Sequence, residues 1–134
     1  MDREDKGHRP MVPISSRTKG LRLREQIRDD VRKTFKLPES DVVARVSPTR
    51  GCDLLLSADA RSRFPFGIVT SASNRFHWYM TYSRAKDLAE SEGLTPVGVF
   101  KRTGEPAYVM LRWTDFLEIA TKLDRLRRIE KDGS

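Results

Sequence analysis

The stretch FPFGIVTSASNRFHWYM, residues 64–80, decides the fold of this chain. Its short apolar run over residues 66–70 is typical of a buried β-strand. The polar residues that follow favour a turn, and Ser73 or Asn74 can cap a helix there. The helix itself is predicted by the spacing of Trp78, Tyr82, Ala85 and Ala89, with Gly93 as its stop. The stretch therefore predicts a buried strand, a polar turn and an aromatic-rich helix.

The residues before this stretch predict a long helix and two strands. An apolar stripe at four-residue spacing predicts a helix over residues 21–36, ended by the Leu37-Pro38 step; the stripe consists of Leu23, Ile27, Val31 and Phe35. Valine-rich residues 41–46 and apolar residues 52–56 predict strands. Ser57 then caps a short helical turn, ADARSR, over residues 58–63.

The residues after it predict a hairpin and a final helix. Residues 97–100 and 107–111 read as strands, joined by the turn KRTGEP over residues 101–106. Thr114 is expected to cap the last helix. The core face of that helix is predicted from helical spacing to consist of Phe116, Ile119, Ala120, Leu123 and Leu126.

The predicted order is helix, three strands, helix, two strands, helix. We expect an α/β (α+β) fold in a single domain, with one mixed sheet flanked by helices. Residues 1–19 are predicted to be a flexible basic N-terminal arm, residues 20–130 the domain, and residues 131–134 a tail.

The composition points to an anionic partner. The chain has 134 residues with a formal net charge of +7, since 26 Lys and Arg face 19 Asp and Glu. Such a balance favours nucleic acid, bound through its phosphates. A single cysteine, Cys52, excludes an internal disulfide framework, and its apolar surroundings predict a buried small side chain. No apolar run is long enough to span a membrane, so we expect a cytoplasmic protein.

Several short motifs together resemble one nuclease family. They are GCDLLLS at residues 51–57, FPF at 64–66, TPVGVFKR at 95–102, AYVML at 107–111 and the helix start WTDFL at 113–117. With the predicted order of elements, they resemble the PD-(D/E)XK nuclease superfamily, in a phage-type branch related to Holliday-junction resolvases. The resemblance covers residues 20–123 and implies a restriction-endonuclease-like core in a phage-encoded protein acting in a bacterial cytoplasm.

The resemblance breaks where its catalytic residues should be. It implies a metal-binding aspartate at Asp53 and, on the first helix, an acid at Glu25. The family's Glu-x-Lys pair falls on Val69 and Ser71, neither of which can replace it, and a frequent glutamine is Arg84. The metal-binding carboxylates of an active member hold Mg²⁺ or Mn²⁺, because hard cations prefer oxygen ligands. Asp53 and Glu25 are thus vestigial catalytic candidates, with an arginine partner and a solvated helix position as the respective structural alternatives.

Three functions follow from this pattern. The leading hypothesis is an impaired or inactive nuclease-fold protein, without a cofactor, that binds branched or duplex DNA or a protein partner. An active divalent-metal-dependent Holliday-junction resolvase and a protein-binding inhibitor of a host or rival factor are the alternatives. A homodimer is also open. The candidate DNA-binding residues are Arg24, Arg28, Arg32, Lys36, Arg50, Arg75, Lys101 and Arg102.

Overall fold

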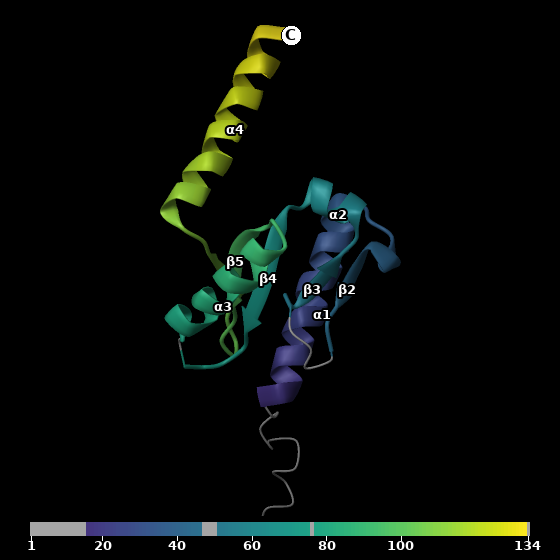
Figure 1. Ribbon diagram of the computed structural model, residues 1–134, viewed down its shortest axis with the longest axis vertical. Coiled ribbons are helices and arrows are strands. Elements are labelled where there is room, and N and C mark those ends of the chain that lie inside the picture. Colours follow the sequence, from purple (N-terminus) through teal and green to yellow (C-terminus); the bar gives the residue numbers. More distant parts are fainter. Residues whose placement is uncertain (1–15, 47–50, 76, 134) are drawn as a thin grey trace, which may run out of the picture.

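The computed structural model describes residues 16–46, 51–75 and 77–133. Its elements alternate much as expected (Figure 1). In chain order they are α1 (Ser16–Phe35), the 3-10 helix η2 (Glu39–Asp41), β2 (Val42–Ala44), β3 (Leu54–Leu56), α2 (Ala58–Arg63), β4 (Phe66–Ser71), α3 (Trp78–Ser91), β5 (Thr95–Phe100), β6 (Tyr108–Met110) and α4 (Trp113–Gly133). The predicted mixed α+β class is confirmed.

The predicted boundaries differ at both ends of the described chain. Helix α1 begins at Ser16 rather than at residue 21, and α4 continues to Gly133, through most of the predicted tail. The rest of the predicted N-terminal arm, residues 1–15, lies outside the described residues.

The strands form two small sheets instead of the single sheet that was predicted. Strand β4 pairs with β5 in parallel, and β5 pairs with β6 antiparallel, so this sheet is mixed. Strands β2 and β3 form a separate antiparallel pair. The two sheets meet where the Asp53 N–H donates to the Ile68 carbonyl at 2.8 Å. Because β3 diverges from β4 after this bond, its three residues pair only with β2.

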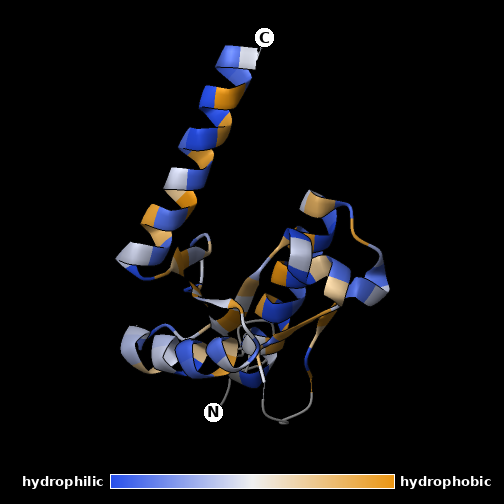
Figure 2. Cartoon of the chain, turned by 45° about the horizontal axis from the view of Figure 1, so that its top comes forward, coloured by the Kyte–Doolittle hydropathy of each residue, from blue (hydrophilic) through white to orange (hydrophobic). Residues whose placement is uncertain are grey.

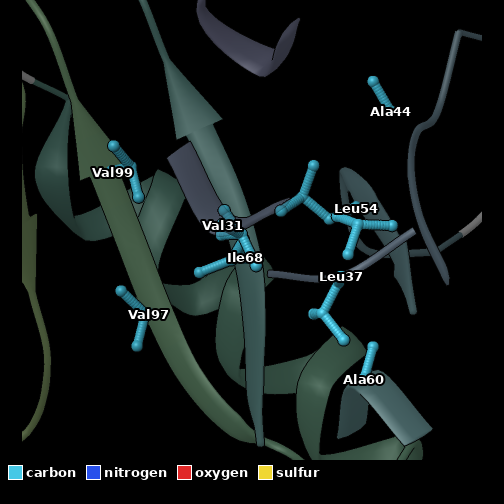
Figure 3. Close-up of a cluster of buried hydrophobic side chains, with 9 residues drawn as sticks. Val31, Leu37, Ala44, Leu54, Ala60, Ile68, Val97 and Val99 are labelled. Carbon is cyan, nitrogen blue, oxygen red and sulfur yellow. The ribbon is translucent and has the colours of Figure 1, made fainter. Parts of the chain in front are cut away.

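Alternation along β4 places two hydrophobic clusters on opposite faces of the sheet. Ile68 belongs to a cluster with residues of α1, β2, β3, α2 and β5, and Figure 3 shows it together with Val31, Leu54 and Val97. Val69 points the other way, into a cluster with residues of α3. Helices α1 and α3 therefore cover opposite faces of β4.

Helix α1 ends at Phe35, one residue before the predicted end, and the chain changes direction at Lys36. This residue has a positive φ of 53°, and the Leu37 N–H donates to the Arg32 carbonyl at 2.9 Å. Such a left-handed residue followed by an apolar one is a common helix end, since the apolar residue packs back on the last turn. Leu37 is accordingly buried in the same cluster as Val31.

The predicted helix caps form in one place and fail in another. Ser57 Oγ accepts a hydrogen bond from the Ala60 N–H at 3.1 Å, so its cap is confirmed. Helix α3 begins only at Trp78, and neither Ser73 nor Asn74 caps it. The Asn74 side chain accepts instead from the Thr103 N–H at 2.9 Å, which joins the β4–α3 and β5–β6 connections.

Helix α4 contradicts the predicted core face. No residue of α4 is buried, and Leu123 and Leu126 are 50% and 59% exposed. Figure 1 shows the helix extending away from the other elements, and Figure 2 shows hydrophobic residues recurring along it. The predicted cap is also wrong, because Thr114 lies inside the helix and Arg112 supplies the carbonyl that accepts from the Phe116 N–H. None of the helices described here is both long enough and apolar enough to cross a membrane.

Candidate functional site

Asp53 is the centre of the candidate site and is completely buried. One carboxylate oxygen, Oδ2, accepts two hydrogen bonds from Thr70, at 2.7 Å from the backbone N–H and at 2.9 Å from the hydroxyl. The backbone bond from Asp53 to Ile68 holds the aspartate beside β4. The sheet junction itself thus positions this carboxylate.

Two arginines from opposite sides of the sheet bind the other oxygen. The Nη2 atom of Arg24, on α1, lies 3.4 Å from Asp53 Oδ1, and the Nη2 atom of Arg84, on α3, lies 3.3 Å from it. Arg24 also donates through Nη1 to the Arg45 carbonyl at 2.6 Å. A buried carboxylate needs such partners, because an unpaired charge in the interior is very costly. Asp53 therefore joins α1, α3 and β4 in one network.

The residues present do not fit the divalent metal that the family resemblance implies. Such an ion takes about six oxygen ligands. Within the described ranges, no three acidic, histidine or cysteine side chains converge. Both oxygens of Asp53 are occupied by nitrogen or hydroxyl donors, and Val69 is a fully buried apolar side chain. The site is built as an ion-pair cluster.

The other expected site residues lie away from this carboxylate. Glu25 is exposed on α1, and its neighbour Arg24 reaches Asp53 in its place. We expected Asp53 and Val69 to lie on adjacent strands with their side chains on the same side of one sheet. Asp53 instead precedes β3, which pairs with β2 and not with β4, and its carboxylate binds Thr70, whose side chain alternates with that of Val69 along β4.

Cys52, beside Asp53, is buried as predicted. Burial raises the pKa of its thiol to about 12, so the reactive thiolate is scarce at neutral pH. This cysteine is a packing residue in the cluster with Val69.

The candidate DNA-binding arginines of α1 mostly make contacts within the chain itself. Arg32 donates to the Val42 carbonyl at 2.9 Å and to the Glu39 carbonyl at 2.8 Å, which fixes the start of β2 against the helix. Arg28 pairs with Asp29 at 2.8 Å. Lys36 is exposed at the helix end, and Arg75 is exposed before α3. Arg50 lies outside the described residues.

Four cationic side chains do come together at one end of α1. Lys101 and Arg102, both predicted, line a hollow of about 200 Å³ together with Lys19 and Arg22 of α1. Lys19 Nζ donates to Thr103 Oγ1 at 3.4 Å, which links the helix to the β5–β6 connection. Lys19 and Arg22 were missed, although their spacing of three residues places them on one side of a helix.

Comparison of the chain with protein-family models, with curated proteins and with solved structures finds no match.

Proposed function

We propose that this chain is a non-catalytic protein with a nuclease-like fold that binds the phosphate backbone of DNA. The observation that carries the proposal is the Asp53 cluster, in which two guanidinium groups surround the carboxylate that the resemblance assigns to a metal. The positive charge that a metal ion would bring to Asp53 is thus supplied by Arg24 and Arg84.

The cluster disfavours metal chemistry for two physical reasons. A divalent cation at Asp53 would meet the like charges of Arg24 and Arg84 at short range. It would also have to displace the two bonds from Thr70 without gaining a second carboxylate. Asp53 in this role stabilises the scaffold.

The cationic hollow supplies the binding surface of the proposal. Lys19, Arg22, Lys101 and Arg102 border a common space from α1 and from the β5–β6 connection. Phosphate groups are bound by such convergent cations without reading base sequence. The chain's net charge of +7 adds long-range attraction to the same partner.

The binding half of the proposal is tested by removing two cations from the hollow. Arg22→Ala with Lys101→Ala should weaken binding to duplex and four-way-junction DNA alike, and should make the slope of log affinity against log salt shallower by about 1.8. The matched control is Lys33→Ala with Lys86→Ala, which removes the same charge from exposed positions on α1 and α3. Equal losses in both pairs, measured by fluorescence anisotropy, would show that only net charge matters and would exclude the hollow as the site.

The catalytic half is tested by incubating the unmodified protein with four-way junctions in Mg²⁺ or Mn²⁺. We expect no cleavage above a protein-free background. Cleavage that is lost in an Asp53→Ala variant still folded by circular dichroism would establish the alternative, an active metal-dependent endonuclease. Absence of any salt-dependent DNA binding would favour the protein-binding inhibitor instead.

A further inference from the structure

Helix α4 carries an apolar stripe that the described residues of its own chain leave uncovered. Its large side chains are between 40% and 69% exposed; they are Trp113, Phe116, Leu117, Ile119, Leu123, Leu126 and Ile129. Folded monomers rarely leave contiguous apolar patches larger than a few hundred Å² in water. The spacing of Phe116, Ile119, Leu123 and Leu126 places these four on one side of the helix.

An apolar groove lies next to the start of this stripe. Its volume is about 320 Å³, and it is lined from α1, β4, β5 and β6 by residues that include Ile27, Phe66 and Val99. Phe116 and Ile119, at the start of α4, line its edge. The groove and the stripe therefore form one continuous apolar surface. Only the first turns of α4, through Phe116 and Ile119, contact the groove.

The chain holds the rest of α4 away from its own groove. Only Leu111 and Arg112 connect β6 to α4. Arg112 pairs with Asp115 at 3.0 Å and with Glu90 of α3 at 3.3 Å, which fixes the direction of the first turn. Figures 1 and 2 show the remaining turns leading outward. Leu123 and Leu126 therefore stay exposed beside the described residues of their own chain, so a partner molecule can cover them.

We propose that the covering molecule is a second copy of this chain, with each α4 packed antiparallel against the other and its far end in the partner's groove. A helix of 21 residues is about 30 Å long. A contact strip about 10 Å wide then covers about 300 Å² of the stripe, and the groove adds a similar footprint. The sum, about 600 Å² per copy, approaches the ~800 Å² of a standard interface.

The charges of α4 favour this partner over a polyanion. In a chain of net charge +7, residues 113–133 contain five acidic and five basic side chains and are neutral overall. Residues 113–123 contain two acids and one base, a net charge of −1, and residues 124–133 contain three acids and four bases, a net charge of +1. An antiparallel pair places each half opposite its complement and also opposes the two helix dipoles. The inference does not depend on the proposed DNA binding.

Sedimentation equilibrium at micromolar concentration tests the proposal. The unmodified chain should have twice the mass of one chain, and Leu123→Glu with Leu126→Glu should reduce it to a single-chain mass. Both leucines are exposed in the single chain, so circular dichroism should remain unchanged. The control, Thr114→Glu with Thr121→Glu, adds the same charge on the opposite side of the helix and should stay dimeric.

A cross-link locates the contact. If the helices cross at the middle of the stripe, the two Leu123 side chains lie nearest each other. Leu123→Cys should then form an intermolecular disulfide with oxidised glutathione, whereas Thr121→Cys should not. The native Cys52 is buried and contributes no background. A single-chain mass for the unmodified protein, equal dissociation of both glutamate pairs, or equal cross-linking at both positions would overturn the proposal.

Discussion

Helices α1 and α4 have similar lengths and similar apolar stripes, yet only one stripe is buried. Helix α1 spans 20 residues and α4 spans 21. In α1, Leu23 and Val31 are 2% and 5% exposed, whereas in α4 Leu123 is 50% exposed. Helical periodicity therefore shows that a helix has a face to bury, and it does not show which surface will cover that face.

The two helices also differ in the contacts that their polar side chains make. Arg24 and Arg32 of α1 donate to backbone carbonyls at both ends of β2, so the helix is held against the strand. On the exposed length of α4, the ion pair between Arg128 and Asp124 stays within the helix. Such an i,i+4 pair supports a helix without docking it.

The largest expected effect comes from placing the same acid on both stripes. Val31→Asp buries an unpaired charge and should lower the free energy of unfolding by about 4 kcal/mol or prevent folding. Leu123→Asp should cost about 0.5 kcal/mol, mostly from helix propensity, when the chains are dilute enough to be separate. Urea unfolding followed by circular dichroism measures both. Equal losses would mean that α4 packs within its own chain.

A second comparison sets the buried ion pair that α1 makes against the exposed pair of α4. Asp53→Ala leaves the Thr70 N–H and hydroxyl without their acceptor and brings Arg24 and Arg84 together without their carboxylate. Because both arginines reach solvent in part, we expect a loss of about 2–3 kcal/mol. Asp124→Ala removes only the exposed partner of Arg128 and should cost less than about 0.5 kcal/mol. Thermal unfolding of the two variants gives both values. A small loss of stability for Asp53→Ala would show that the Asp53 cluster does not stabilise the fold.

The smallest effects concern caps at helix starts. Ser57→Ala removes the bond to the Ala60 N–H and should cost about 1 kcal/mol. Thr114→Ala should change stability by no more than about 0.5 kcal/mol, because Thr114 lies within α4 and does not cap it. Chemical denaturation with a fixed m-value resolves this difference. The reverse order would restore Thr114 as a cap.

Local patterns predicted the elements well because they report local physics. The cap at Ser57 and the stop at Gly93, which has a positive φ of 72°, both follow from neighbouring residues. The sheet junction could not be read in this way. Whether β3 continues beside β4 or diverges after Asp53 depends on contacts between residues far apart in the sequence.

The candidate site shows the same limit. The motif identifies Asp53, and an arginine partner for this carboxylate is the structural alternative that the sequence predicts. Which arginines reach it could not be predicted, since Arg24 and Arg84 arrive from helices on opposite faces of the sheet. Thr70 was passed over because the motif treats its position as unspecified, although its hydroxyl and N–H bind the carboxylate.

The arrangement of β4, α3 and β5 has a consequence for the order of folding. These elements are consecutive in the chain, and α3 packs on the parallel pair that it connects. The parallel pair joins residues 29 apart in the sequence, such as Phe66 and Thr95, whereas the β2–β3 pair joins residues 10 to 14 apart. Longer loops cost more entropy to close, and parallel pairs form slowly. We expect this unit to gain protection after α1 and the β2–β3 pair during refolding. Pulsed hydrogen exchange should then show β2 amides protected before those of β5, and the reverse order would place the nucleus in β4, α3 and β5.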